Sequence, residues 1–329
     1  MKPLSIFAAV LLASPLLAAD PIVLEGKDGI GKGKHVVLVS GDQEYRSEET
    51  IPQLAKILAE RHGFKCTVLF TVDKSGVIDP NVPNIPGLEA LKTADLAIIF
   101  TRLLKMPDDQ MQHIHDYIES GKPIVGLRTS THAFDNGGNS PFAKYGNGSN
   151  VKGGEGGFGR VVLGEKWVAH HGNHGKEGTR GIVAPGQDKS PILKGIEPAS
   201  IFGTTDVYTA NPPKTSTILV LGEVTETLMP DSKAVTGKKN DPMMPVAWTK
   251  PYQGESGKEG RAFCTTMGAS QDFAYEGTRR LIVNGSLWAL GMEEKIPAKT
   301  NVDLVGDYKP TPFKFGGHAK GVKPADLFK

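Results

Sequence analysis

The most constraining feature of this sequence is an apolar run that turns polar within one residue. Residues 123–127 read Pro-Ile-Val-Gly-Leu, without polar alternation, which is typical of a parallel strand covered on both faces. The next five residues, Arg128-Thr-Ser-Thr-His132, are all polar. Ligands of open α/β sheets bind outside the carboxyl ends of the strands, so this junction is a candidate site. Capping of a following helix would explain one Ser or Thr, but not Arg128 and His132 together.

Earlier in the chain, further apolar runs alternate with helical patterns. The predicted strands are residues 35–41, 66–70 and 95–101, and the predicted helices are residues 47–62, 88–92 and 107–120. This β-α-β-α-β-α-β order predicts an α/β fold, with a mainly parallel sheet, right-handed crossovers and helices on both faces. The first strand runs into Ser40-Gly-Asp-Gln-Glu-Tyr45, which is neither a dinucleotide fingerprint nor a P-loop.

The second half of the chain is less regular. Residues 136–181 are rich in glycine, and a loop of this length inside a domain is usually functional or mobile. The loop contains Trp167-Val-Ala-His-His-Gly-Asn-His174. After it we expect short strands at residues 181–184, 200–210, 216–224, 244–249 and 260–266. An amphipathic helix is expected at residues 273–290. No boundary divides the chain into two domains.

The bulk composition and the N-terminus indicate an exported globular protein. The 329 residues carry a net charge of only +2, which gives no sign of a nucleic-acid partner. Residues 1–19 read as a signal peptide, with Lys2, an apolar core and Ala18-Ala19 before the cleavage point. We therefore expect a periplasmic or secreted protein without membrane insertion after cleavage. The predicted segments are a signal peptide (1–19), an N-terminal arm (20–33), one main domain (34–292) and a C-terminal tail packed on it (293–329).

The chain has two cysteines, Cys66 and Cys264, and each lies in an apolar strand-like run. An exported protein permits a disulfide between them. Two buried free thiols that pack as small hydrophobic side chains are the favoured alternative.

The order of several motifs resembles the ThuA-like (trehalose utilisation) family over residues 35–292. The motifs are Val39-Ser-Gly-Asp-Gln-Glu-Tyr45, residues 124–134, His170-His171, Asp206-Val-Tyr208, and residues 245–248 followed by 260–268. The resemblance implies a class I glutamine amidotransferase-like fold, which is flavodoxin-like and doubly wound. The tail at 303–310 is similar to that of exported versions common in planctomycete-type bacteria.

Two positions depart from the family pattern. Arg128 stands where the family usually has His, and Ala269 where it often has His. Glutamine amidotransferases proper carry a nucleophilic Cys at the end of the strand that corresponds to residues 123–127 of this chain. Because Arg128, Thr129 and Ser130 stand there instead, cysteine-based glutamine hydrolysis is excluded.

The junction suggests acid/base chemistry. His132 can transfer protons near neutral pH, and Arg128 can hold a sugar oxygen with its fork of donors. Asp42 and Glu44, at the end of the first strand, are expected on the same rim and would assist. The alternative is a carboxylate–Arg pair that only ties two loops together.

Further residues are candidates for substrate contact, namely Tyr45, Ser130, His170, His171, Asp206, Tyr208 and Asp272. Asp206 and Tyr208 would share one face of a strand. Asp272 either contacts ligand or caps the last helix. His170, His171 and His174 could bind a divalent metal, contact substrate or only hydrogen-bond within the loop, and no other cofactor is indicated.

Three functions are compatible with this pattern. The leading hypothesis is an enzyme that acts on a keto-sugar such as 3-keto-trehalose, or on a related glycoside, as a hydrolase, lyase or isomerase. The second is a non-catalytic carbohydrate-binding protein. The third is a metal-dependent hydrolase that uses His170, His171 and His174. In each case the partner is a small carbohydrate, and a homo-oligomer is compatible with the sequence.

Overall fold

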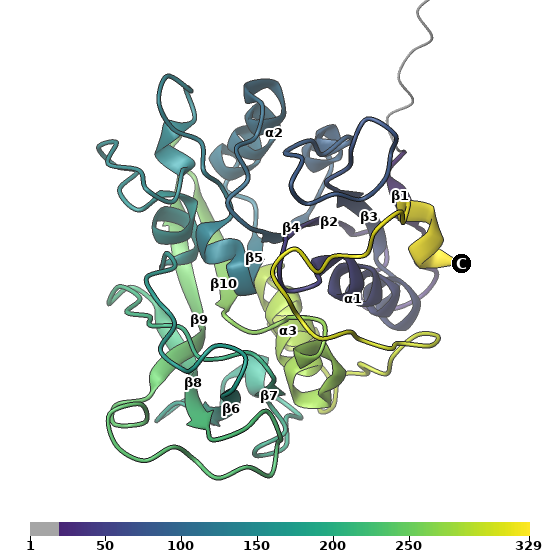
Figure 1. Ribbon diagram of the computed structural model, residues 1–329. Helices are drawn as coiled ribbons and strands as arrows, with labels where there is room; N and C mark the ends of the chain where they lie inside the picture. Colours follow the sequence, from purple (N-terminus) through teal and green to yellow (C-terminus); the bar gives the residue numbers. More distant parts are fainter. Residues whose placement is uncertain (1–19) are drawn as a thin grey trace, which may run out of the picture.

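The computed structural model describes residues 20–329 (Figure 1), so the predicted signal peptide at 1–19 lies outside the described residues. The strands are β1 (Ile22–Leu24), β2 (His35–Gly41), β3 (Lys65–Phe70), β4 (Leu96–Thr101), β5 (Ile124–Leu127), β6 (Gly178–Val183), β7 (Phe202–Gly203), β8 (Thr217–Thr225), β9 (Met244–Gln253) and β10 (Glu259–Thr265). The α-helices are α1 (Ser47–His62), α2 (Asp108–Glu119) and α3 (Glu276–Ala289). Within 20–329, no helix combines the length and the apolar character that crossing a membrane requires.

All ten strands form one sheet in the order β1-β3-β2-β4-β5-β10-β9-β8-β6-β7. Four pairings, those among β3, β2, β4, β5 and β10, are parallel, and the other five are antiparallel. The fold is therefore α/β, but the prediction of a mainly parallel sheet is wrong for the second half of the chain. A parallel connection needs a crossover of a dozen or more residues, and residues 254–258 between β9 and β10 are too few. The predicted N-terminal arm contributes β1, which pairs with β3 at the edge of the sheet far from β7.

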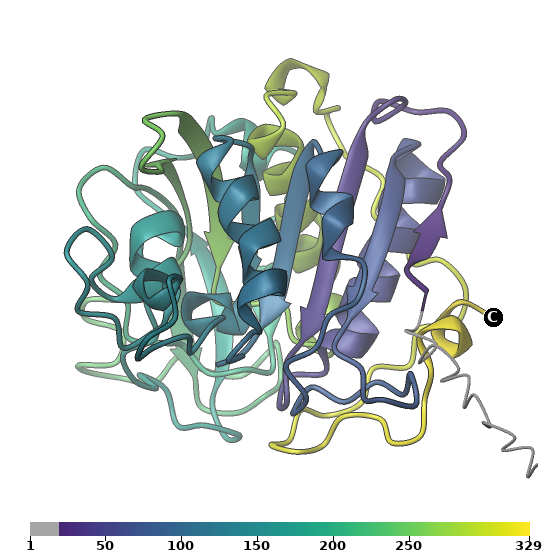
Figure 2. The ribbon, with the colours of Figure 1, turned by 90° about the horizontal axis from the view of Figure 1, so that it is seen from above.

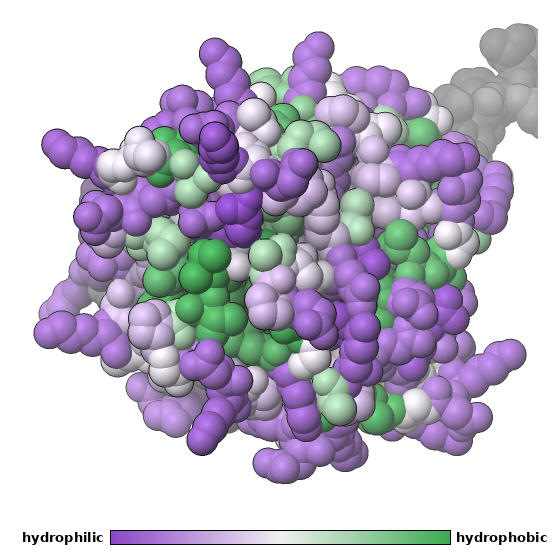
Figure 3. All heavy atoms as spheres, turned by 90° about the horizontal axis from the view of Figure 1, so that it is seen from below, coloured by the Kyte–Doolittle hydropathy of each residue, from purple (hydrophilic) through white to green (hydrophobic). Residues whose placement is uncertain are grey.

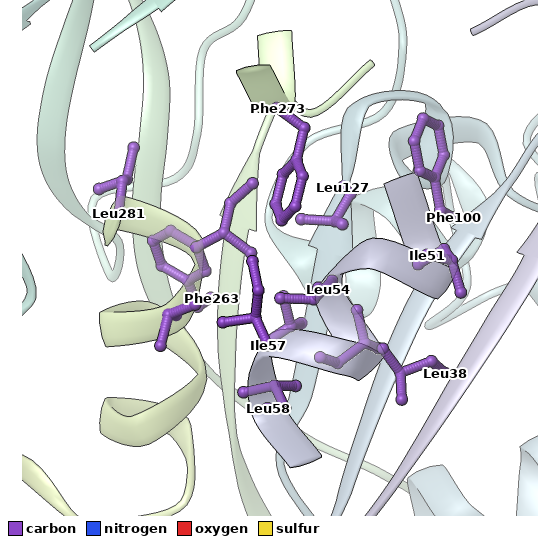
Figure 4. Close-up of a cluster of buried hydrophobic side chains, with 14 of the residues drawn as sticks. Leu38, Ile51, Leu54, Ile57, Leu58, Phe100, Leu127, Phe263, Phe273 and Leu281 are labelled. Carbon is purple, nitrogen blue, oxygen red and sulfur yellow. The ribbon is translucent and has the colours of Figure 1, made fainter. Parts of the chain in front are cut away.

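Helices cover both faces of the parallel strands. On one face, α1 and α3 pack against the sheet through one apolar cluster, which includes Leu54, Leu58, Phe263 and Leu281 (Figure 4). Apolar residues four apart lie on one side of a helix, which explains why α1 presents Leu54 and Leu58 together. On the other face, α2 packs through Met111 and neighbouring apolar residues into a second cluster.

The chain leaves the parallel strands at the end of β5 and returns to them at β10. Because β5 and β10 pair in parallel, residues 128–258 form one continuous excursion between two neighbouring strands. The excursion includes β6 to β9 and the loops around 167–174 and 204–210, which lie beside the parallel strands in Figure 1.

The C-terminal tail crosses the edge of the sheet where the parallel strands end, in yellow in Figure 2. The Lys314 backbone N–H donates to the carbonyl oxygen of Glu44 (2.9 Å), and Gly316 N–H donates to that of Gln43 (2.8 Å). These bonds fix the tail against the turn that follows β2.

Cys66 and Cys264 are free, buried thiols in the two different apolar clusters, as favoured from the sequence. The face in Figure 3 is largely polar around a hollowed apolar patch. Beside β6 the structure has an apolar pocket, whose lining includes Val183 and Leu193. None of the residues that line this pocket belongs to the candidate site.

Candidate functional site

The site begins at the junction after β5, where Arg128 has a φ of 41°. A positive φ in a non-glycine residue costs about 1–3 kcal/mol and persists only where the surroundings enforce it. Here the Arg128 backbone N–H donates to the Met267 carbonyl oxygen (3.2 Å), which ties the turn to the end of β10. The short 3₁₀ turn Arg128–His132 follows and is buried throughout.

The side chain of Arg128 is completely buried and braces two loops. Its Nη1 donates to the carbonyl oxygens of Asp206 and Thr266, both at 2.8 Å. Its Nη2 donates to Asp206 Oδ1 (3.1 Å) and to the Tyr45 hydroxyl (3.2 Å), and the guanidinium lies between the rings of Tyr45 and Tyr208. The prediction that Arg128 holds a sugar oxygen does not fit this geometry. The alternative, a carboxylate–Arg pair that ties loops together, does, with Asp206 as the carboxylate.

Asp206 is the centre of a charged network. His170 Nδ1 lies 2.7 Å from Asp206 Oδ2, and His174 Nδ1 lies 3.0 Å from Oδ1. Burial alone would raise the pKa of Asp206, but the hydrogen bonds from both histidines and the charge of Arg128 hold it well below its usual range. Asp206 is therefore an anion at any physiological pH.

His174 lies between two carboxylates, because its Nε2 is also 3.0 Å from Glu44 Oε1. Hydrogen bonds to Asp206 and Glu44 raise the pKa of His174 to about 9. Burial opposes ionisation of Glu44, but its contacts with His174 and Arg102 lower its pKa on balance. At neutral pH the three charges alternate in sign.

Close packing of two segments of the excursion places the histidines around Asp206. His171 N–H and Gly172 N–H both donate to the Val207 carbonyl oxygen, at 2.8 and 3.0 Å. A Cβ atom on Gly172 would lie 3.1 Å from Asp206 Cβ, so this approach favours glycine. The glycine in His170-His-Gly-Asn-His174 therefore allows the two histidines to flank one carboxylate.

His132 lies beside this network, 4% exposed. Its Nδ1 is 3.2 Å from Thr131 Oγ1, and its Nε2 has no hydrogen-bond partner within residues 20–329. The ring centroid is 5.6 Å from that of Trp167 and 6.3 Å from that of Tyr208. Burial, and then the charges of Arg102 and Arg128, lower the pKa of His132 well below 6.5. His132 is therefore neutral at pH 7.

The side chains of Asp42 and Ser130 hydrogen-bond to nearby backbone groups. Asp42 Oδ1 accepts the Glu44 N–H (2.7 Å) and the Tyr45 N–H, and Oδ2 accepts the Thr129 hydroxyl (2.6 Å). Ser130 Oγ lies within hydrogen-bond distance of the carbonyl oxygens of Leu127 and Ile99, to either of which its hydroxyl can donate, and it accepts the Leu127 N–H (3.2 Å). Both side chains are buried and engaged, which does not fit the predicted catalytic role of Asp42 or the predicted substrate contact of Ser130.

Asp272 and His171 are likewise occupied elsewhere. Asp272 is fully buried and accepts the Thr205 hydroxyl (2.7 Å) and the Gly268 N–H (3.1 Å). His171 Nε2 lies 2.8 Å from the carbonyl oxygen of Lys239. The predicted metal set with His171 is therefore not assembled. Asp206 takes its place, because ligand atoms of His170, His174 and Asp206 lie within 4.8 Å of one another.

The match to a known family spans most of the chain. A family model described as "ThuA: Trehalose utilisation" matches residues 35–289. The chain belongs to the ThuA family. No curated protein matches it.

Two solved structures similar to this ThuA-family chain are described as putative ThuA-like proteins. The one from Parabacteroides merdae ATCC 43184 is 15% identical, covering 86% of this chain and 98% of that chain, with a TM-score of 0.47. The one from Bacteroides uniformis ATCC 8492 is 16% identical, covering 78% of this chain and 90% of that chain, also with a TM-score of 0.47.

Two side chains at the site of this ThuA-family chain were not predicted from the sequence. Arg102 follows β4 directly, and its Nε lies 3.5 Å from Glu44 Oε2. The strand-end rule that selected residues after β2 and β5 would have found it. Phe313 of the tail lies with its ring centroid 5.1 Å from those of Tyr45 and His174. Nothing in the Pro/Lys-rich tail distinguished Phe313.

Proposed function

We propose that this ThuA-family protein acts on a carbohydrate by general acid/base chemistry, with His132 as the base. The observation that carries the proposal is the environment of His132. Its ring is buried and neutral at pH 7, and its Nε2 has no hydrogen-bond partner within the described chain. A neutral imidazole with an open nitrogen is in the protonation state that a general base requires, and burial keeps His132 in that state at pH 7. The family's association with trehalose utilisation supports a sugar as the substrate.

The neighbours of His132 suit a sugar ring. The half-buried indole of Trp167 offers an apolar surface for the C–H face of the ring. His170 and His174 each have 36% of the side chain exposed and lie in the same aromatic cluster, where they can bind hydroxyl groups. Arg128 is a positioning residue in this proposal, since it holds Asp206 and through it both histidines.

The proposed substrate is a keto-sugar, such as an oxidised disaccharide of the 3-keto-trehalose type. A carbonyl group makes the adjacent C–H acidic, and His132 Nε2 removes that proton. The electron pair forms a C=C bond as the C–O bond to the leaving sugar breaks, and the leaving oxygen takes a proton from solvent. Hydrolysis would use the same base to activate water.

The proposal includes a location and a fold relationship. We place the protein in the periplasm or outside the cell, because residues 1–19 have the pattern of a signal peptide. We also assign the parallel half to the flavodoxin-like, class I glutamine amidotransferase-like arrangement. The order β3-β2-β4-β5-β10 is second-first-third-fourth-fifth along the chain, which is the flavodoxin order and supports the assignment.

The test is turnover of 3-keto-trehalose and 3-keto-glucosides by purified residues 20–329, followed by NMR. We expect His132→Asn to lower kcat/KM by at least about 100-fold, the range of a lost general base. His171→Ala is the matched control, because its ring contacts Lys239 instead of the cluster, and it should keep wild-type activity.

Each result decides between the hypotheses. Unchanged turnover in His132→Asn would remove His132 from the mechanism. Saturable sugar binding without turnover would favour the non-catalytic carbohydrate-binding protein. The absence of both binding and turnover would reject the carbohydrate proposal.

A further inference from the structure

Each ring nitrogen of His174 faces a carboxylate oxygen. Nδ1 is 3.0 Å from Asp206 Oδ1, and Nε2 is 3.0 Å from Glu44 Oε1. A neutral imidazole has one N–H and one lone pair, so it can donate to only one of the two acceptors. The other contact therefore requires a second positive species between nitrogen and oxygen, either a proton or a metal ion.

His170 approaches the same carboxylate from the other side. Its Nδ1 is 2.7 Å from Asp206 Oδ2, and ligand atoms of His170, His174 and Asp206 lie within 4.8 Å of one another. We propose that these three residues bind one divalent transition-metal ion. Two imidazoles and one carboxylate suit ions such as Zn²⁺, Mn²⁺ or Co²⁺, whereas Mg²⁺ and Ca²⁺ prefer all-oxygen sites.

The groups around these ligands have the arrangement that metal sites require. A metal-ligating histidine commonly donates its other ring N–H to a carboxylate, and Glu44 is that carboxylate for His174. Ligating carboxylates are themselves hydrogen-bonded, and Arg128 Nη2 donates to Asp206 Oδ1 (3.1 Å). Glu44 is held in turn by Arg102 and by the backbone contact with the tail. These contacts around the three ligands support a metal site separately from the distances among the ligand atoms.

The site is open on one side. Asp206 is fully buried, whereas His170 and His174 have 36% of their side chains exposed. Three protein ligands with an accessible face leave a coordination position for water or substrate, as in catalytic sites, while structural sites are closed by four ligands. A bound ion would polarise a carbonyl or hydroxyl oxygen in the cluster that contains His132. The nearby charge of Arg128 offsets part of the charge of Asp206, so we expect weaker binding than at a site whose carboxylate has no cationic partner.

The experiment uses residues 20–329, stripped with a chelator and titrated calorimetrically with Zn²⁺, Mn²⁺ and Co²⁺. At least one ion should bind at one per chain, confirmed by metal analysis after dialysis. His170→Ala and His174→Ala should each weaken binding at least about tenfold, and Glu44→Gln about 10- to 100-fold as a lost supporting contact. His171→Ala, the matched control next to the ligands, should bind as the wild type does.

Two results would overturn the proposal. One is a folded wild-type chain, checked by circular dichroism, that binds none of the three ions. The other is equal affinity in the wild type, His170→Ala and His174→Ala. The bound ion should also raise Tm in the wild type and in His171→Ala but not in His174→Ala. Because no sugar enters the experiment, its result is separate from that of the turnover test.

Discussion

The ring of Phe313 stacks on the ring of Tyr45, with 5.1 Å between the centroids and 30° between the planes. The same Phe313 ring lies 5.1 Å from that of His174. A residue in the middle of the tail therefore packs against both the turn after β2 and the segment that carries His174. The tail is part of the wall of the candidate site.

Phe313→Ala should lower the free energy of unfolding by about 1–2 kcal/mol, somewhat less than the loss of a fully buried aromatic ring. The control is Met229→Ala, an apolar side chain that is 60% exposed, which should change stability by less than about 0.5 kcal/mol. Urea unfolding of both variants measures the difference. Equal effects would show that the Phe313 contact does not stabilise the tail.

Asp206→Asn should destabilise the protein by about 3–5 kcal/mol, because it leaves Arg128 as a buried cation without its carboxylate partner. The control is Asp307→Asn, which breaks the exposed ion pair with Lys309. Such exposed pairs contribute little to stability, because solvent screens the two charges. Chemical denaturation of the two variants compares them, and a mild effect of Asp206→Asn would mean that Arg128 finds other compensation.

His132 should make the free energy of unfolding depend on pH below about 6.5. Its pKa is lowered in the folded protein, mainly by burial, so below 6.5 the unfolded chain takes up a proton that the folded chain does not. The free energy of unfolding should therefore fall as the pH drops below 6.5, and less steeply in His132→Asn. Denaturation curves between pH 5 and 8 measure the difference between the two proteins. Parallel curves would indicate that His132 is accessible to protons in the native state.

Both thiols should be unreactive in the native protein. Burial raises the pKa of Cys66 and of Cys264, and the thiolate is the reactive form. Ellman's reagent should therefore label neither cysteine in native protein and both in denaturant. Labelling of one thiol under native conditions would locate a segment that opens locally.

The first half of the fold was predictable because each strand is an uninterrupted apolar run between helical patterns. The predicted bounds of β2 and α1 agree with the structure, and those of β4 differ by one residue. The second half was less predictable, because apolar patterning reports burial and does not report the direction of the pairing partner. Residues 200–210 were expected as one strand, but only Phe202–Gly203 joins the sheet.

The sequence indicated which strand ends meet, but not which side chains pair there. Asp42 lies on the same rim as the residues after β5 and accepts the Thr129 hydroxyl, whereas the carboxylate that pairs with Arg128 is Asp206. Asp42 satisfies the backbone N–H groups of its own turn, a local role that Asp often takes. Asp206 reaches Arg128 from 78 residues away along the chain, and no local pattern specifies such a partner.

Because β5 and β10 are neighbours, the protein divides into a framework, made of the parallel strands and their helices, and a replaceable cassette, residues 128–258. The chain can depart after Leu127 and rejoin at Glu259 without disturbing the register of the parallel strands, whatever the length of the excursion between them. Glu44 follows a strand of the framework, whereas His132, His170 and His174 all belong to the cassette. Divergence of ligand preference among proteins built in this way therefore requires the exchange of only one continuous stretch of sequence.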